Sequence, residues 1–181
     1  MQHPFLVGDK IYLRSLVDED VDGPYFGWLN DQQSDVHTSH AIWPNSRARM
    51  KNFLDRIGEG RTDLVLAIVE KPSDRHIGNI GLHEINWVHR CATLAILVGE
   101  ADARGKGYGR EAINLLVRHA FDRLNLHRIQ LGLRADNVAA LRAYQGAQFR
   151  EEGRFVEAMY GGGKYHDVIR MARINDNSET D

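Results

Sequence analysis

Apolar and polar residues alternate along several short segments of the chain, and this pattern predicts strands. Residues 10–16 alternate in this way from Lys10 to Leu16, as a half-buried strand does. Further segments have the length and apolar content of strands and are bounded by turn residues. They are 64–69, 76–85, 91–98, 128–133, 149–160 and 165–173. The last two flank Gly161–Gly163 and predict a hairpin.

Apolar residues at intervals of three and four positions predict helices elsewhere. The acidic run Asp18–Asp20 suits the first turn of one helix, and Ser46 suits the cap of another, which we expect to stop at Gly58. The expected helices cover about 18–29, 46–57, 109–124 and 137–145. The order β-α-α-β-β-β-α-β-α-β-β predicts a mixed α/β (α+β) domain with a largely antiparallel sheet and one parallel crossover.

Composition narrows the class of protein. The chain has 181 residues, 43% of them apolar, which predicts a single domain over residues 1–174 and a flexible polar tail over 175–181. The net charge of -2, without a basic cluster, predicts no nucleic-acid partner. A single cysteine, no long apolar run and no signal-peptide pattern at the N-terminus predict a cytoplasmic protein that does not enter a membrane.

The stretch 101–112, ADARGKGYGREA, places three glycines and the cations Arg104, Lys106 and Arg110 just before a predicted helix. Glycines at this point let backbone N–H groups converge on an anion at the positive end of the helix, and phosphate is the natural candidate. A P-loop does not fit, because Gly107 follows Lys106 where Ser or Thr is needed. The dinucleotide-binding fingerprint G-x-G-x-x-G does not fit either, because only one residue separates Gly107 from Gly109. A plain surface turn remains the alternative.

A third scheme fits the loop. Arg104–Gly109 resembles [QR]-x-x-G-x-[GA], the pyrophosphate loop of the GNAT superfamily of acetyl-CoA-dependent N-acetyltransferases. Arg134–Asn137, followed by Tyr144, resembles the second cofactor segment of that superfamily. Trp28–Asp31 and the segment 152–168 are similar to the Rim-type branch, which acetylates ribosomal-protein N-termini, and to related nucleotide-aminosugar acetyltransferases. The resemblance implies a GNAT-type fold, with a mostly antiparallel seven-stranded sheet and about four flanking helices.

The resemblance spans residues 7–174 and implies acetyl-CoA as cosubstrate. Pantetheine would run beside the strand 94–98, which we expect to be bulged near Leu97–Gly99. Asn137 would bind the pantetheine arm, and Tyr144 would protonate the departing thiolate. Their alternative roles are a helix cap and a core aromatic. The implied cofactor-binding residues are Leu97, Val98, Arg104, Gly105, Lys106, Gly107, Tyr108, Gly109, Arg110, Asn137 and Tyr144.

Transfer to an amine also requires a base, because an ammonium has no lone pair with which to attack a thioester. In the ribosomal N-acetyltransferases a Glu two residues before the Arg-Ala-x-Asn segment serves as base, and here that position is Gly132. Glu84 is the preferred candidate, so the predicted catalytic residues are Tyr144 and Glu84. His83 should point to the opposite face of the strand. It remains open as an alternative, as do His37, His40 and a chain of water molecules.

Two other mechanisms receive little support. Cys91 opens a strand without an acid or base at a recognisable spacing, so direct attack in a ternary complex is favoured over a covalent acetyl-enzyme. The nine histidines include no H-x-x-x-H or H-E-x-x-H pattern, so we expect no metal site.

The acceptor site should involve the N-terminal third of the chain, where loops near the two early helices vary in this superfamily. Its predicted contacts are Trp28, Asn30, Asp31 and Trp87, with Trp43 as a further aromatic. Candidate acceptors are a protein N-terminus, a nucleotide-linked amino sugar, a polyamine and an aminoglycoside, and near-neutral charge argues mildly against a strongly cationic one. A non-catalytic acyl-CoA sensor of the same fold is the alternative function. A homodimer is left open.

Overall fold

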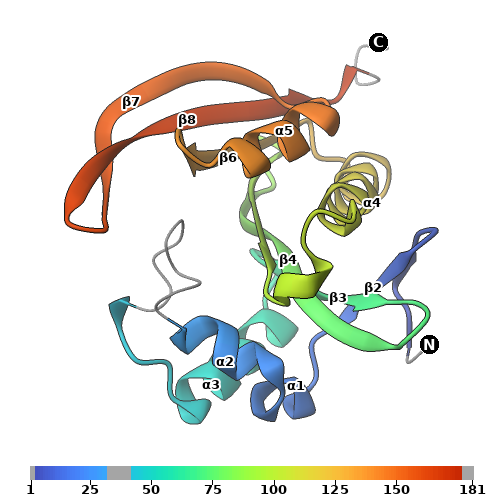
Figure 1. Cartoon of the computed structure of the whole chain (residues 1–181). Coiled ribbons are helices and arrows are strands. Elements are labelled where there is room, and N and C mark those ends of the chain that lie inside the picture. The colour runs from blue at the N-terminus through green and yellow to red at the C-terminus, as the bar shows by residue number, and fades with distance from the viewer. Residues whose placement is uncertain (1–2, 32–41, 177–181) are drawn as a thin grey trace.

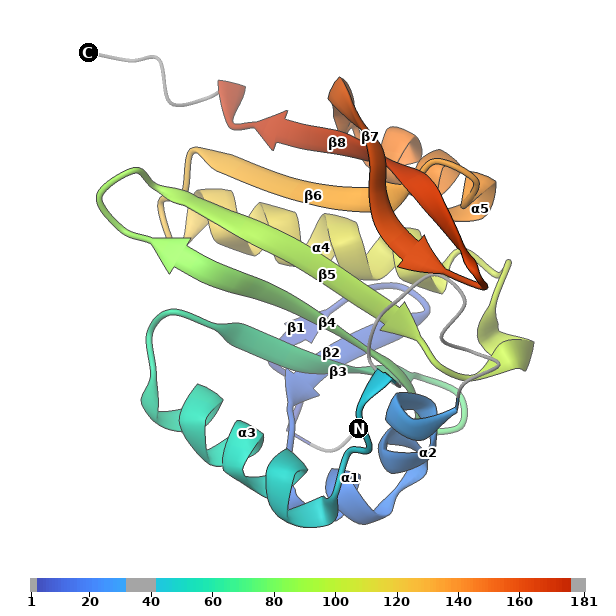
Figure 2. The same ribbon diagram turned by 90° about the vertical axis from the view of Figure 1, so that its left-hand side faces the viewer.

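The computed structural model describes residues 3–31 and 42–176, which form one eight-stranded sheet with helices on both faces (Figures 1 and 2). The strand order is β1-β2-β3-β4-β5-β6-β8-β7. The strands are β1 (Leu6–Val7), β2 (Ile11–Ser15), β3 (Leu64–Glu70), β4 (Arg75–Asn86), β5 (Cys91–Val98), β6 (Arg128–Arg134), β7 (Arg150–Gly161) and β8 (Lys164–Ile174). Among the strands in the described residues, only the neighbours β5 and β6 are parallel. The mostly antiparallel mixed fold is therefore confirmed, and the eighth strand is the short β1, which pairs with β2.

The helices differ from the expected set at the N-terminal end. They are α1 (Asp18–Asp22), α2 (Pro24–Asn30), α3 (Arg47–Glu59), α4 (Tyr108–Asp122) and α5 (Val138–Gly146). The single helix expected over 18–29 is wrong, because Gly23 is extended and Pro24, which lacks a backbone N–H, starts a new helix. Ser46 caps α3 as expected, but α3 continues through Gly58 to Glu59, and Gly60 is its C-cap.

Two apolar layers hold the helices against the sheet. On one face, Ile80, Leu82 and Leu94 pack in the main core together with the buried residues of α4. On the other face, α1, α2 and α3 pack around a second cluster of Val21, Tyr25, Met50 and Leu54. None of the helices in the described parts of the chain is both long and apolar enough to cross a membrane.

The parallel pair β5 and β6 is joined over a very short distance. Only Cys91–Thr93 pairs with Arg128–Gln130, and beyond these residues the two strands diverge toward the wide end seen in Figure 2. β5 continues beside β4 as far as Val98, and β6 continues beside β8. The β4–β5 register is regular up to Val98, and the irregularity expected near Leu97–Gly99 lies at its far end: the N–H groups of Gly99 and Glu100 both donate to the carbonyl oxygen of Ile77, at 3.0 and 3.2 Å, as in a β-bulge. The wedge opens where β5 and β6 stop pairing after Thr93 and Gln130.

Candidate active site

The glycine loop leaves open space at the start of α4. Gly105 and Gly107 have φ values of 74° and 87°, in the left-handed region that glycine tolerates best. No atom lies within 4 Å of the position that a Cβ would take at either residue. Gly107 is the N-cap of α4, whose first backbone N–H groups have no partner inside the helix. The loop thus presents free amides and the positive end of a 15-residue helix to an approaching anion.

The cationic side chains of the loop are placed differently from one another. The Arg104 guanidinium donates to the carbonyl oxygens of Val98 (3.0 Å) and Gly99 (3.1 Å), so it ties the loop to the end of β5. Lys106 and Arg110 are exposed. We infer that Arg104 shapes the loop, whereas Lys106 and Arg110 are the cations left to meet a phosphate.

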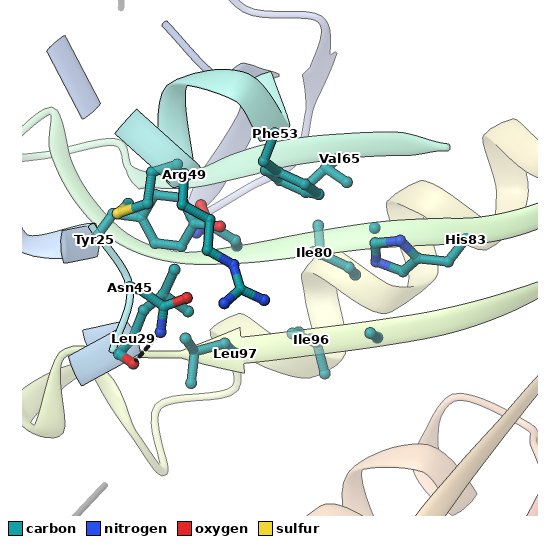
Figure 3. A pocket seen from close by; sticks show the side chains of 14 residues that line it. Tyr25, Leu29, Asn45, Arg49, Phe53, Val65, Ile80, His83, Ile96 and Leu97 are labelled. Atoms are coloured by element: carbon teal, nitrogen blue, oxygen red, sulfur yellow. Dashed lines mark hydrogen bonds between the residues drawn. The ribbon is translucent and has the colours of Figure 1, made fainter. Parts of the chain in front are cut away.

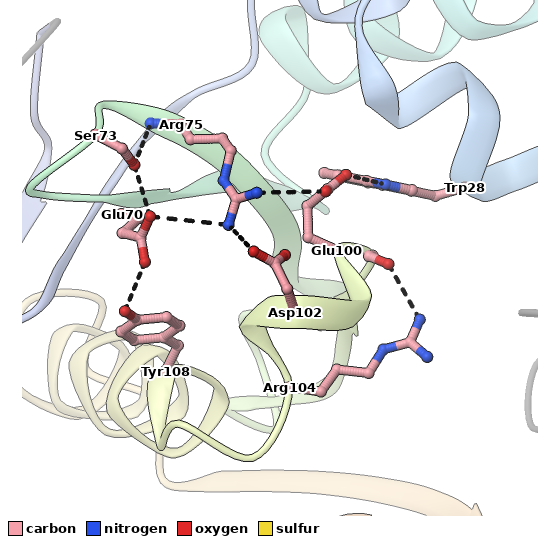
Figure 4. Close-up of polar contacts among 9 residues, drawn as sticks. Trp28, Glu70, Ser73, Arg75, Glu100, Asp102, Arg104 and Tyr108 are labelled. Carbon is pink, nitrogen blue, oxygen red and sulfur yellow. Dashed lines mark hydrogen bonds and ion pairs between the residues drawn. The ribbon is translucent and has the colours of Figure 1, made fainter.

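An ion-pair network holds the loop against β3 and β4 (Figure 4). Arg75 lies 2.8 Å from the carboxylate of Asp102, 3.7 Å from Glu100 and 3.9 Å from Glu70. Glu70 in turn accepts a 2.6 Å hydrogen bond from the Tyr108 hydroxyl at the first position of α4. The Arg75 guanidinium, shared by three carboxylates, fixes the loop to the sheet. The Tyr108 hydroxyl is engaged by its hydrogen bond to Glu70.

Trp28 supports the same region from α2. Its indole nitrogen donates to Glu100 at 3.0 Å, and its ring covers Gly99, where a Cβ would fall 2.0 Å from the ring. The ring also meets His76 edge-on at 5.0 Å between centroids. Trp28 therefore packs beneath the end of β5, and the sequence-based prediction that it contacts the acceptor remains untested.

The second cofactor segment forms α5, which carries Tyr144 and lies near the wide end of the wedge (Figure 2). Asn137 caps α5, since its side-chain oxygen accepts from the Ala140 N–H at 3.1 Å. The Tyr144 ring is 7% exposed and packs on Phe149, with 5.8 Å between ring centroids. Burial raises the pKa of Tyr144 to about 12, so its hydroxyl keeps its proton at neutral pH. That hydroxyl forms no hydrogen bond with any residue that the structure describes.

A pocket of about 270 Å³ lies on the face of the sheet opposite α4 (Figure 3). Strands β3, β4 and β5 form its floor, and α2, α3 and the segment before α3 form its walls. Its lining consists of Tyr25, Leu29, Asn45, Arg49, Met50, Phe53, Val65, Asn79, Ile80, Gly81, His83, Ala95, Ile96 and Leu97. Because Ala95–Leu97 also form the edge of β5 at the wedge, the pocket borders the place where the two strands separate.

His83 and Asp63 form a pair at one end of this pocket. His83 Nδ1 lies 2.8 Å from Asp63 Oδ1, and the ring is directed into the pocket in Figure 3. Burial tends to raise the pKa of Asp63, but hydrogen bonds from His83 and Thr62 outweigh it, and the pKa is lowered. The ionised Asp63 favours the tautomer with the proton on Nδ1, which leaves the lone pair on Nε2. The missing side chain of Gly81 makes room for that nitrogen, since a Cβ there would lie 3.0 Å from it.

Glu84 is placed less favourably for the role of base. It is exposed, has a φ of 53° and sits where the β4–β5 register is interrupted between His83 and Asn86. It does not line the pocket. Gly132 is exposed on β6, where a Cβ would lie 3.1 Å from Arg170 Nη1 and 3.3 Å from Val168, so it supplies no base and faces β8. His37 and His40 lie outside the described residues.

The other predicted acceptor contacts also lie away from the pocket lining. Asn30 bonds to the backbone of Phe26 and Asn45, and so fastens the end of α2. Asp31 follows α2 and is exposed. The Trp87 indole donates to the Arg61 carbonyl beside the β4–β5 turn, at the end of β5 opposite the glycine loop. Trp43 is 72% exposed.

Sequence reasoning missed most residues of the pocket. Arg49 and Phe53 are four positions apart on α3 and so share one helix face, which is a signal visible in the sequence. Asn79 and Gly81 lie two apart on β4 and share the pocket face of the sheet with His83. Nothing in the sequence indicates that these two faces meet.

The splayed parallel strands, the glycine loop at the start of α4 and the tyrosine of α5 together define a GNAT-type acetyltransferase fold. The chain belongs to this family, since residues 10–150 match the family model described as an acetyltransferase (GNAT) domain.

Known proteins of the family resemble the chain to different extents. It is 38% identical over 104 residues to the spermidine N(1)-acetyltransferase of Vibrio cholerae, a match that covers 58% of the chain and 60% of that relative. It is 33% identical over 94 residues to the Escherichia coli enzyme of the same name, covering 52% of the chain and 50% of that relative. The crystal structure of the V. cholerae enzyme in complex with CoA and spermine superposes with a TM-score of 0.84 at 26% identity, covering 92% of this chain and 96% of that one.

Proposed function

We propose that the protein transfers an acetyl group from acetyl-CoA to a primary amine by direct attack in a ternary complex. The observation that carries this proposal is the position of the β5 edge. It borders the wedge and the glycine loop on one side and the 270 Å³ pocket on the other. A thioester beside β5 would be within reach of an amine in the pocket. Family membership and the CoA-bound V. cholerae structure support acetyl-CoA as the donor.

The proposed cofactor site follows the loop, the strand and α5 in turn. The pyrophosphate would bind the backbone amides from Gly105 to Arg110, where Gly105 and Gly107 leave open space. Pantetheine would run beside Leu97 and Val98, along the edge of β5 that has no partner strand. The side-chain NH₂ of Asn137 is left to meet the pantetheine arm, because its oxygen caps α5.

A protonated amine must lose two protons, one before its nitrogen attacks and one afterwards, and the sulfur must gain one. We propose that His83 Nε2 takes the first and passes it to solvent, with Asp63 holding the ring in the required tautomer. The amine nitrogen then attacks the thioester carbonyl carbon, and the tetrahedral intermediate loses its second N–H proton to the freed imidazole. As the C–S bond breaks, Tyr144 donates its proton to the thiolate and is reprotonated from solvent. The positions of His83 in the pocket and of α5, which carries Tyr144, at the wide end of the wedge support this division of roles.

For the acceptor, we propose a small amine in preference to a protein N-terminus, because a pocket of about 270 Å³ has the size of a small-molecule site. The spermidine acetyltransferases among the relatives also support a small amine. A homodimer stays a prediction, which light scattering of the purified protein tests.

The experiment that tests the proposed function is release of CoA thiol from acetyl-CoA, followed with a thiol reagent across a panel of amines, with CoA binding measured in parallel. We expect CoA to bind and thiol release to depend on an amine. CoA binding without amine-dependent release would instead support a non-catalytic acyl-CoA sensor. An absence of CoA binding would contradict both.

A further inference from the structure

The amide of Asn79 has a defined orientation at the floor of the pocket. His76 Nε2 lies 2.9 Å from the carbonyl oxygen of Gly78 and 2.8 Å from the side chain of Asn79. A carbonyl oxygen can only accept, so Nε2 must carry a proton, and the Asn79 atom facing it must be the oxygen Oδ1. The Asn79 NH₂ group is consequently turned away from His76.

That NH₂ group has no partner in the part of the chain that the structure describes. Asn79 is 6% exposed, its Nδ2 is buried without a hydrogen bond, and the residue lines the pocket. Buried amide donors in folded proteins are nearly always paired. A ligand that supplies an acceptor oxygen would satisfy this donor once the Asn79 side chain turns toward the pocket.

Arg49 adds a charge to the same pocket. Its side chain extends from α3 into the pocket in Figure 3, and its guanidinium forms no ion pair or hydrogen bond with any described residue. By contrast Arg47, two positions earlier, is paired with Asp22 at 2.6 Å. Among its described lining residues the pocket has no Asp or Glu. The described part of the lining therefore offers unpaired donors and a positive charge, and within it no carboxylate is present to attract a second ammonium group.

We propose that the acceptor is an amine that also carries an anionic group, a carboxylate or a phosphate, which binds to Arg49 and Asn79. This inference rests on the proposed function and names the class of its substrate. The planar guanidinium can hold two oxygens of such a group at once, and the Asn79 NH₂ can donate to another. With the anionic group held there, the amine can reach His83 and the edge of β5. A polyamine, which carries only ammonium groups, would meet the charge of Arg49 without compensation.

Matched pairs of amines that differ only in the anionic group test this proposal. The pairs are α-amino acids with their amides, glucosamine 6-phosphate with glucosamine, and 2-aminoethyl phosphate with ethanolamine; spermidine is added as a polycation. We expect the anionic member of at least one pair to exceed its neutral partner and spermidine at least tenfold in kcat/KM. The amino acids and the phosphates separate the two kinds of anion.

Substitutions on α3 connect the preference to Arg49. Arg49→Gln should lower kcat/KM for the anionic member tenfold or more and change the neutral member less than twofold. Arg49→Lys should restore part of the loss. Arg47→Gln removes the same charge from the same helix and should leave both members unchanged. An equal loss for both members in Arg49→Gln, or a preference of the wild type for neutral amines or spermidine, would overturn the proposal.

Binding separates failure of this inference from failure of the proposed function. Calorimetric titration of the CoA-loaded protein with each amine should show tighter binding of the anionic member in the wild type, and loss of the difference in Arg49→Gln. If this difference is found but no thiol is released with any amine, the anion site stands and the transfer reaction does not. If no pair is distinguished by binding or by turnover, the anion site is wrong.

Discussion

The glycine loop and the pocket, on either side of the β5 edge, are built from different kinds of residues. The loop consists of consecutive residues whose backbone faces open space at Gly105 and Gly107. The pocket consists mainly of side chains from α2, α3 and three strands, and two of them, His83 and Asn79, are held by Asp63 and His76. A site for a shared cofactor can rest on backbone groups that a few glycines expose, whereas a site for a particular acceptor depends on individual side chains.

The largest expected effect concerns the pocket. His83→Gln removes the proposed base and should lower kcat by about 100-fold or more at neutral pH, because a positioned proton acceptor contributes about 10²- to 10⁴-fold. The loss should shrink as pH rises, since more of the amine is then unprotonated before it binds. The pH profile of kcat with a good acceptor provides the measurement.

A second variant separates catalysis by His83 from packing. His83→Ala leaves a gap beside Gly81, and added imidazole should restore part of the rate if the lost function is proton transfer. A drop of less than threefold in His83→Gln, with an unchanged pH profile, would mean that the pocket supplies no base through this residue.

A change in the loop should act on binding alone. Gly107→Asp places a negative charge where the pyrophosphate would approach, so the Kd for CoA should rise at least tenfold, about 1.4 kcal/mol. Gly107→Asn is the matched control, because Asn has nearly the same shape and tolerates the left-handed conformation as well. Calorimetry with CoA should show a much smaller loss for Asn. Equal losses would attribute the effect to backbone strain instead of charge.

Tyr144→Phe tests the cofactor side of the chemistry. The ring packs on Phe149 with or without its hydroxyl, so the fold and CoA affinity should stay near those of the wild type. The kcat value should fall at least about tenfold, because the thiolate loses its proton donor. Wild-type turnover in a folded Phe variant would leave Tyr144 as a core aromatic only.

The smallest effect is expected at Glu84. Its side chain is exposed and lies outside the pocket lining, so Glu84→Gln should change kcat less than twofold. If this variant instead shows the loss and the altered pH profile expected of His83→Gln, the role of base belongs to Glu84, as the sequence first indicated.

The loop, α4 and α5 could be predicted because their signals are local. The sequence itself shows three glycines within five residues and the spacing from Asn137 to Tyr144. The break between α1 and α2 was also visible at Pro24, but the continuous apolar spacing across it favoured one helix. The pocket was not predictable in this way. In the sequence, Asn79 is simply a polar residue within a strand. Its orientation depends on the contact with His76. Next to His76, at Ile77, the pairing of β4 with β3 is irregular, and the sequence does not show this.

The short β5–β6 ladder has a mechanical consequence. Three residue pairs are the only strand pairing between β1–β5 and β6–β8, so the sheet has a seam, and the two halves depend on α4 and the shared core to stay together. Heat or denaturant should open the molecule first along this seam. A ligand lodged in the wedge would take the place of the missing strand contacts. Amide hydrogen exchange in 94–98 and 131–134 should therefore slow on addition of CoA more than exchange in β3, which is paired along its whole length.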